Sequence, residues 1–480
     1  MSSKKGKRNK TILFSAVGTT DPISKNHDGS ILHIVRHYHP DEVHLYYSCE
    51  MYKYEQKDHR MEQSLELLMQ KMGFHFTVQD IYETDRDDVQ EFDYYLKRFQ
   101  EILAELYRNN QKARILVNVS SGTPAMKSAL QSLAVFSAFP ITPIQVTTPI
   151  KKANHMRDDI DAVQMFEEDH DNESDAPDRT SESRTTNLLK VTYRGIIKEL
   201  IDAYDYRPAI KIAKKIEDDD FKKAAQMICI AADRLDLIRP LPTGDEEEQF
   251  SGVFEQKDMS REYLLYLDIL VKQKRYIDFG RAISPMLSEL MKRTLEQECD
   301  FDFSKYTYQT TINSSDGQSI DQPKVIVHWN VGAQNEIQED FNITLFDSIN
   351  NRNWKLYDKG FVRDGDLAAL ILTMHETLGK VDQTSYTQIW ALRNFEEKVR
   401  NILAHEMEGI SDKTVRDITN YGCNDYMRML KDLSVPTGVI QSEELTTMWS
   451  TYKDINKQIL KTLGEGEYVK EQKDQQTRSE

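Results

Sequence analysis

Residues 114–127 read RILVNVSSGTPAMK, and this stretch decides the fold of the first third of the chain. It begins with β-branched residues and passes, without a break, into residues that start a helix. Thr123 is a typical N-terminal helix cap, and Pro124 suits the first helical position, where a missing N–H costs nothing. The stretch therefore predicts a buried strand that leads through a short Ser/Gly loop into a helix.

The same alternation of strand and helix extends on both sides of this stretch. Runs rich in β-branched and aromatic residues predict five strands, at 11–17, 42–48, 74–81, 114–119 and 141–147. Apolar residues at helical spacing predict four helices between them, at 29–39, 56–72, 91–107 and 124–137. Such an alternation indicates an α/β, Rossmann-like domain with a doubly wound parallel sheet, in which ligands bind beyond the carboxyl ends of the strands.

The loop after the fourth predicted strand has the chemistry of a phosphate site. Gly122 lets a ligand approach the backbone closely, and the first N–H groups of the helix carry partial positive charge. The hydroxyls of Ser120, Ser121 and Thr123 add donors, so a phosphate could be held without a cluster of basic side chains. Similar groups follow the first strand in Gly18-Thr19-Thr20-Asp21, and the two loops would line one pocket.

These loops have a simpler interpretation as well. Ser, Gly, Thr and Pro are common in ordinary strand-to-helix turns, so a turn and cap without a ligand remains an alternative. Neither loop reads Gly-x-Gly-x-x-Gly, and the chain has no Gly-x-x-x-x-Gly-Lys-Ser/Thr motif. A dinucleotide cofactor and a P-loop NTPase are therefore disfavoured.

The composition changes abruptly after the α/β region. Residues 157–184 carry eleven acids against three arginines, and the second half of this segment has almost nothing apolar to bury, which predicts a solvated linker. Amphipathic patterns predict helices through nearly all of the remaining chain, with a break near Pro285. The expected domains are an α/β domain at 1–165, an acidic linker at 166–187, a helical middle domain at 188–299 and a helical bundle at 300–480. An insertion at 300–357 holds two strand-like runs, at 325–329 and 343–346.

Charge and cysteine usage narrow the class of protein. The 480 residues carry 62 Lys and Arg against 79 Asp and Glu, a net charge of −17, so we expect neither a coat for nucleic acid nor stable DNA binding. The four cysteines are far apart and indicate no disulfide framework or zinc site. The N-terminus leads directly into a strand-like run, and no stretch approaches about 18 apolar residues. A soluble, cytoplasmic protein without membrane contact is expected.

A second motif, Arg400-Asn401-Ile402-Leu403-Ala404-His405, lies on a helix predicted over 385–407. A histidine can supply the acid or base for metal-free RNA cleavage, while an arginine stabilises charge on the phosphate. An Arg and a His on a helix surface are also ordinary, so the motif alone indicates little. Five steps of about 100° place Arg400 and His405 about 140° apart, so they would meet only at a distorted helix end or across an interface with a second copy.

The two motifs and their order resemble the CARF-HEPN accessory endoribonucleases of type III-A, or Csm-type, CRISPR systems. The resemblance covers nearly the whole chain: a Rossmann-like CARF domain with the Asn-x-Ser-Ser-Gly-Thr-Pro loop, a helical middle domain, and a HEPN domain with Arg-Asn-x-x-Ala-His. It implies an enzyme of antiviral defence whose CARF domain binds cyclic oligoadenylate, with cyclic hexa-adenylate as the expected ring. Binding would switch on a metal-independent ribonuclease that cleaves single-stranded RNA by attack of the 2′-OH.

The resemblance also assigns roles to residues of this sequence. It makes His405 the acid or base, Arg400 the phosphate stabiliser and Asn401 the group that orients them. The residues that it assigns to the cyclic oligoadenylate are Thr19, Thr20, Asp21, Asn118, Ser120, Ser121, Gly122 and Thr123. Thr123 is also the candidate for slow cleavage of this activator. A homodimer is implied, with a composite HEPN site and no cofactor.

Two alternatives stand beside this hypothesis. His33, His37 and His39 include a pair at i,i+4 that could bind a metal, but no carboxylate or Cys is obviously placed to complete the set, and no metal is expected. The second functional candidate is a nucleotide-sensing regulatory protein without catalysis, whose helical half binds a partner.

Overall fold

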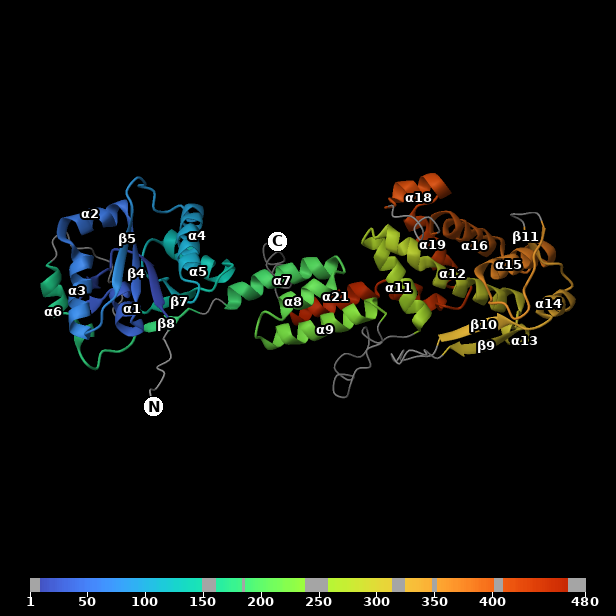
Figure 1. The fold of residues 1–480 in the computed structure, drawn as a ribbon, viewed down its shortest axis with the longest axis horizontal. Coiled ribbons are helices and arrows are strands. Elements are labelled where there is room, and N and C mark those ends of the chain that lie inside the picture. The colour runs from blue at the N-terminus through green and yellow to red at the C-terminus, as the bar shows by residue number, and fades with distance from the viewer. Residues whose placement is uncertain are drawn as a thin grey trace, which may run out of the picture. The chain divides into compact units, whose positions relative to one another are not determined.

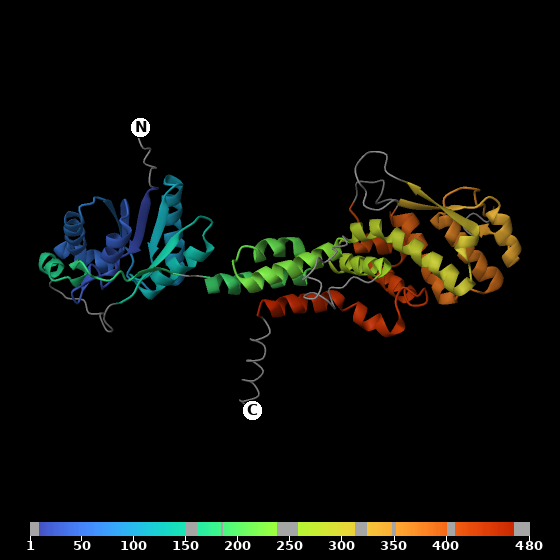
Figure 2. The same ribbon diagram turned by 90° about the horizontal axis from the view of Figure 1, so that it is seen from below.

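A computed structural model describes residues 9–148, 161–183, 186–237, 258–312, 324–347, 352–400 and 409–464 of the chain. The chain divides into a first unit, Met1–Thr192, and a second unit, Tyr193–Glu480. Strands and helices alternate in the first unit, whereas the second is mostly helical (Figures 1 and 2).

A six-stranded sheet in the order β5-β4-β1-β6-β7-β8 forms the centre of the first unit. Its strands are β1 (Thr11–Ala16), β4 (Glu42–Ser48), β5 (Thr77–Glu83), β6 (Arg114–Asn118), β7 (Thr142–Val146) and β8 (Thr180–Glu182). The first five run parallel, and Leu13 of β1 lies opposite Val43 of β4 and Leu116 of β6. The expected Rossmann-like α/β domain, followed by helical domains, is confirmed.

Helices cover both faces of the sheet, and every residue of β1 and β4 is therefore buried. α1 (Ser30–Tyr38) and α3 (Arg60–Met72) pack on one face, while α4 (Phe92–Asn109) and α5 (Pro124–Phe136) pack on the other, as Figure 1 shows. The sequence predicted one helix over 56–72. The structure has α2 (Cys49–Asp58) and α3 instead, because His59 between them takes a left-handed conformation, with φ of 51°.

The acidic segment differs most from its prediction. Much of the expected linker at 166–187 belongs to the first unit, where α6 (Ala162–Glu167), the 3-10 turn η1 (His170–Asn172) and β8 are formed. β8 extends the sheet by pairing antiparallel with β7. Asp169 and Asp171 are buried. Acids can be buried here because Arg179 pairs with Asp171 and a hydrogen-bond network surrounds both, which the local composition does not reveal.

The helices around the start of the second unit pack with the last helix that the structure describes. α7 (Thr186–Asp202), α8 (Tyr206–Ala213) and α9 (Asp219–Leu235) come first, and α21 (Thr451–Thr462) packs beside α9. The amide of Asn456 in α21 accepts a hydrogen bond from the Tyr206 hydroxyl at 2.7 Å and donates one to the Ile201 carbonyl at 2.7 Å. The sequence-based division at residue 299 therefore separates helices that share a core.

Further helices of this unit are α11 (Met259–Lys272), α12 (Tyr276–Cys299), α15 (Asp364–Leu378), α16 (Gln383–Phe395), α18 (Asp412–Thr419), α19 (Cys423–Leu433), η3 (Ser442–Glu444) and α20 (Leu445–Met448). The break expected near Pro285 is wrong, because α12 continues through it. Ile283, Met286 and Leu287 are buried on both sides of the proline and keep the helix packed. Among the described residues, no helix is long and apolar enough to cross a membrane.

The insertion forms small elements against α15. They are α13 (Phe303–Tyr306), β9 (Thr307–Ile312), β10 (Lys324–Trp329), α14 (Ala333–Phe341), β11 (Phe346–Asp347) and β12 (Arg352–Asn353). The strand expected at 325–329 is confirmed within β10, while the run at 343–346 reaches a strand only at its last residue. β9 and β10 form an antiparallel hairpin.

Candidate functional site

The carboxyl ends of β1 and β6 lie next to each other where the chain order of the sheet reverses. From β1 the chain continues outward to β4 and β5, returns to β6, and continues the other way to β7, which is where α/β sheets leave a crevice for ligands. A pocket of about 490 Å³ opens at this point. Six of the residues expected to bind a ligand line it: Thr19, Thr20, Ser120, Ser121, Gly122 and Thr123.

Asp21 fixes the first loop from below. Its buried carboxylate accepts hydrogen bonds from the N–H of Gly18 at 3.1 Å, from the N–H of Ile31 at 3.2 Å and from the hydroxyl of Ser121. Burial raises the pKa of Asp21 in spite of these bonds. A Cβ at Gly18 would lie 2.7 Å from Ser121 Oγ, so the two loops can approach this closely only with glycine there.

Asn118 fixes the second loop in the same way. Its fully buried side chain donates to Ser15 Oγ at 2.9 Å and to Ser30 Oγ at 2.8 Å, and it accepts from the Ser120 N–H at 2.9 Å. Neither Asn118 nor Asp21 is among the residues that line the pocket. These two side chains support the loops, because their polar atoms bond to the protein itself, and their contact with a ligand stays a prediction.

The hydroxyls of the second loop also have protein partners. Ser120 accepts from the Val146 N–H, Ser121 donates to Asp21, and Thr123 donates to the Val89 carbonyl. As predicted, Thr123 caps α5, by accepting from the Met126 N–H, and Pro124 occupies the first helical position. The N–H groups of Gly122 and Thr123 have no acceptor among the described residues. The backbone amides at the start of α5 are thus the donors that remain for an anion.

The pocket also contains basic residues that the sequence did not suggest. Lys25, Lys127 and Arg179 line it together with two acids, Asp28 and Glu50. Lys127 is in α5, while Lys25 lies in the turn of a short hairpin, β2 (Ile23–Ser24) and β3 (His27–Asp28). Three basic residues against two acids, with free amides beside them, favour an anionic ligand. Nothing in the sequence indicated that Arg179 lines the pocket, because this residue lies in the acidic segment, far along the chain from both loops.

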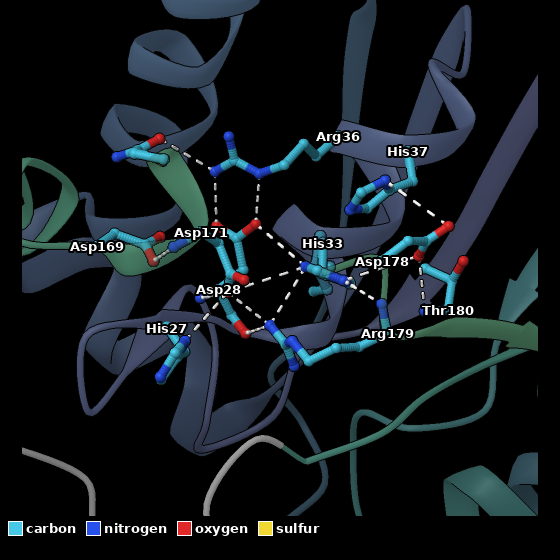
Figure 3. Close-up of polar contacts among 12 residues, drawn as sticks. His27, Asp28, His33, Arg36, His37, Asp169, Asp171, Asp178, Arg179 and Thr180 are labelled. Carbon is cyan, nitrogen blue, oxygen red and sulfur yellow. Dashed lines mark hydrogen bonds and ion pairs between the residues drawn. The ribbon is translucent and has the colours of Figure 1, made fainter. Parts of the chain in front are cut away.

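A buried network of charges holds Arg179 (Figure 3). Its Nη2 lies 2.6 Å from Asp171 Oδ2, and its backbone N–H donates to His33 Nε2 at 2.9 Å. The other ring nitrogen of His33, Nδ1, lies 3.4 Å from Asp28 Oδ2 and 3.2 Å from Arg179 Nη2. The network joins the segment before β8 to α1 and so positions one wall of the pocket.

Asp28 and Asp169 form a carboxyl pair in this network. Arg36 binds Asp28 through Nε at 2.7 Å and Nη2 at 3.0 Å. Burial would raise the pKa of Asp28, but hydrogen bonds from His33 and Arg36 outweigh it and lower that pKa. Burial and the neighbouring Asp28 carboxylate raise the pKa of Asp169 to about 8. At neutral pH the proton of the pair therefore stays on Asp169, where it satisfies an oxygen, Oδ2, that has no other donor among the described residues.

This pair predicts how stability depends on pH. Because the pKa of Asp169 is higher in the folded chain than the usual 3.9, its contribution to stability is complete below about pH 4 and is lost as the pH rises through about 8. The loss is at most about 1.4 kcal/mol per pH unit. Asp169→Asn keeps a donor toward Asp28 but cannot ionise, so its unfolding temperature should fall less between pH 5 and 9 than that of the wild type.

Differential scanning calorimetry of the full chain at pH 5, 7 and 9 measures this difference. Asp175→Asn is the control, because Asp175 is an exposed acid of the same segment. Parallel pH curves for wild type and Asp169→Asn would show that the carboxyl pair does not share a proton.

Two of the three histidines considered for metal binding are close together. His33, His37 and Asp178 have ligand atoms within 4.8 Å of one another, whereas His39, which follows α1, is outside this group. His33 already accepts from the Arg179 N–H through Nε2 and faces Asp28 through Nδ1. A metal here would have to displace these bonds.

The helix expected to carry the second motif changes geometry where the motif begins. α16 ends at Phe395, and the chain continues as a π-helical turn, η2 (Glu396–Arg400). The regular α-helix expected over 385–407 is therefore wrong at Glu396–Arg400, and its part at 401–407 lies outside the described residues. Phe395 and Val399 are fully buried and anchor this turn. A π turn closes its hydrogen bonds over five residues, where an α turn closes them over four. Asn401 and His405 lie outside the described residues, as does the side chain of Arg400.

Arg393 pairs with two acids of the turn that leads into this motif. It pairs with Glu396 and, at 2.8 Å, with Glu397. The charges of these two acids are therefore compensated by a basic residue about one turn earlier.

Comparison with known proteins places three domain models in succession along the chain. They are the Cas_Csm6 CARF domain at residues 78–180, the CRISPR-associated protein Csm6 6H domain at 183–235 and the Cas_Csm6 HEPN domain at 242–460. A relative named CRISPR system endoribonuclease Csm6, from Mycobacterium tuberculosis (strain ATCC 25618 / H37Rv), is 28% identical over 435 residues, which cover 89% of this chain and 94% of the relative.

A protein of Enterococcus italicus is similar in both sequence and fold. The relative of the same name from strain DSM 15952 / CCUG 50447 / LMG 22039 / TP 1.5 is 26% identical over 427 residues, 85% of this chain and 91% of its own. A solved structure, Enterococcus italicus Csm6 bound to cyclic hexa-2'-fluoro-hexa-dAMP, covers 94% of this chain and 100% of its own, with a TM-score of 0.64 at 20% identity. Because CARF, 6H and HEPN models follow one another here and the fold agrees, the chain belongs to the Csm6 family of CRISPR-associated CARF-HEPN proteins.

Proposed function

We propose that this chain is a cytoplasmic endoribonuclease of CRISPR defence, and that cyclic oligoadenylate bound in the first unit switches on RNA cleavage in the second. One observation carries the proposal: a chain of this family combines an anion pocket at the switch point of its sheet with the Arg400-to-His405 motif. The free amides of Gly122 and Thr123, with Lys127 beside them, fit a phosphate of such a ring. The cyclic hexa-nucleotide bound to the Enterococcus italicus protein supports a ring of six adenylates as the ligand of this chain.

The chemistry proposed for the second unit needs no metal. His405 takes the proton of a ribose 2′-OH, or gives one to the leaving 5′ oxygen, while Arg400 stabilises the charge on the phosphorane. The 2′ oxygen bonds to phosphorus and the bond to the 5′ oxygen breaks, which leaves a 2′,3′-cyclic phosphate and a 5′-OH. Asn401 orients the phosphate or the imidazole.

A homodimer completes both sites in this proposal. One ring would span the pockets of two copies, and two Arg/His sets would face each other in a composite site. The dimer also removes the difficulty that Arg400 and His405 are about 140° apart on an ideal helix, because each could act with residues of the other copy.

RNA cleavage in the presence of EDTA tests the proposal. Labelled single-stranded RNA is incubated with the protein alone, with a ring of four adenylates and with a ring of six. We expect cleavage only when a ring is present, and more with six than with four. A protein that bound a ring but cut no RNA under any of these conditions would instead be the non-catalytic regulator.

The role of Thr123 in slow degradation of the ring is a separate proposal. Thr123→Val is expected to abolish this degradation, because it removes the hydroxyl beside the free amides. It also removes the cap of α5, at a cost of about 1 kcal/mol, whereas Thr123→Ser keeps hydroxyl and cap. Chromatography of the ring over hours measures its decay. Unchanged decay with Thr123→Val would exclude Thr123 from the reaction.

A further inference from the structure

A row of aromatic side chains crosses the insertion. Tyr308 of β9 lies opposite His328 of β10, and Phe361 forms an isolated antiparallel bridge with His328 on the other side. Residues opposite each other on neighbouring strands share a face of the sheet. The rings of Tyr308 and His328 are stacked, with centroids 5.1 Å apart and planes at 14°, and those of His328 and Phe361 are 4.9 Å apart.

The row is open to solvent on one side and anchored on the other. The side chains of Tyr308 and Phe361 are 37% and 58% exposed. Trp329, the next residue after His328, points to the opposite face, where it is buried and donates its indole N–H to Asp366 Oδ2 at 3.0 Å. Trp354 donates to Oδ1 of the same carboxylate at 3.0 Å. These bonds on the buried face fix the strand that carries His328, and so they fix the position of the exposed rings in the single chain.

The segment that contributes Phe361 to this row is rich in basic residues, in a chain that is acidic as a whole. Residues 352–363 contain four basic residues and one acid, Asp358. Lys355 and Arg363 lie 5.9 and 5.3 Å from the ring centroid of Tyr357, another exposed aromatic residue. Lys355 and Lys359 are exposed and have no ion pair among the described residues. The carbonyl of Lys359 contacts His328 Nδ1 at 3.1 Å, which places this residue beside the row.

Exposed aromatic rings beside unpaired lysines have the chemistry that binds single-stranded nucleic acid. Bases stack on the rings, and the lysines release counterions from the phosphates. We propose that Tyr308, His328 and Phe361, with Lys355 and Lys359, form a binding surface for single-stranded RNA that is separate from the Arg400-to-His405 motif. The inference rests on the proposed ribonuclease function and adds a second contact with its substrate. A second copy of the chain fits this surface less well, because a symmetric contact would bring the unpaired lysines together.

The test measures RNA binding by the full chain without cleavage. A fluorescent, unstructured 20-nucleotide RNA is titrated in EDTA with protein that carries His405→Ala, and anisotropy gives Kd. Adding Tyr308→Ala and Phe361→Ala should raise Kd by about five- to 150-fold for each stacked base that is lost. Adding Lys355→Gln and Lys359→Gln instead should reduce the slope of log K against log salt by about 1.4, since each phosphate contact on a single strand contributes about 0.7.

Matched controls separate this surface from general effects. Phe136→Ala removes an aromatic residue that is 54% exposed in the first unit, and Lys71→Gln removes an exposed charge there; both should leave Kd and the salt slope unchanged. The lysine variants keep the test valid if the aromatic variant folds poorly. Parent-like binding by the lysine variant and by a folded aromatic variant would overturn the inference. So would a loss of dimer in either variant during size-exclusion chromatography with light scattering, which would make the surface a contact between copies.

The outcome is independent of whether the proposed catalysis is correct. Cleavage is measured with the same surface variants made without His405→Ala. If the surface is wrong, these variants cleave long and four-nucleotide RNA as the wild type does, and the variants that carry His405→Ala bind the long RNA as their parent does. If the ribonuclease hypothesis is wrong, no RNA is cut by wild type, yet the effect of the variants on Kd is still measured. A rise in KM for long RNA, with unchanged kcat for the short RNA, is the expected result when both hold.

Discussion

His405→Ala is expected to lower the ring-activated rate of RNA cleavage by about 10²- to 10⁴-fold, because the variant has no group that can exchange a proton with the 2′-OH or the 5′ oxygen at neutral pH. The rate is measured with labelled single-stranded RNA in EDTA at a saturating concentration of cyclic hexa-adenylate. The effect should appear in kcat, since the imidazole acts in the transition state and contributes little to RNA binding.

His59→Ala is the matched control for this experiment. His59 is an exposed histidine of the first unit, between α2 and α3, and lies far along the chain from the motif. Its replacement should leave kcat unchanged. Circular dichroism and light scattering establish that both variants fold and assemble like the wild type. Full activity in folded His405→Ala protein would remove this residue from the mechanism.

Lys127→Glu is expected to raise the concentration of ring needed for half-maximal activation by about a hundredfold. Lys127 lines the pocket one turn into α5, where the free amides of Gly122 and Thr123 also lie. A charge-assisted hydrogen bond to a phosphate is worth about 1.5–3 kcal/mol, so its loss alone weakens binding at least about tenfold. If one ring binds to two copies of the chain, two Lys127→Glu substitutions weaken its binding, and the expected effect is about a hundredfold.

The control for this variant is Lys71→Glu. It makes the same change of charge at an exposed position of α3 that does not line the pocket, so activation should stay as in the wild type. At saturating ring Lys127→Glu should recover the full rate of cleavage, because the second unit is unaltered. Wild-type activation of Lys127→Glu at low ring concentration would mean that the ring binds elsewhere.

Local signals in the sequence were sufficient for much of the α/β unit. The strand that ends at Asn118, the cap at Thr123 and the helix that starts at Pro124 depend on neighbouring residues, so their types could be assigned without tertiary information. Because alternating strands and helices allow few topologies, the position of the pocket followed from the fold class.

Contacts between distant residues could not be predicted in this way. The composition of 166–187 indicates solvation, but Asp171 is buried because Arg179 and the network around α1 compensate its charge. Asn118 and Asp21 were predicted to contact the ligand. In the structure Asn118 bonds to Ser30 and Asp21 bonds to Ser121, and these partners are far away in the sequence and meet only in the folded chain. The π turn that ends at Arg400 depends on the buried side chains of Phe395 and Val399, and a helical repeat does not reveal it.

The central claim is that a ring bound in the first unit controls cleavage in the second. The most direct test titrates cyclic hexa-adenylate into the protein and follows, under identical conditions in EDTA, ring occupancy by calorimetry and the initial rate of RNA cleavage. We predict that RNA is left uncut without ring, that the rate rises in proportion to occupancy, and that it reaches a plateau at one ring per two chains. Cleavage at the same rate without ring, or full occupancy with no cleavage, would contradict the claim.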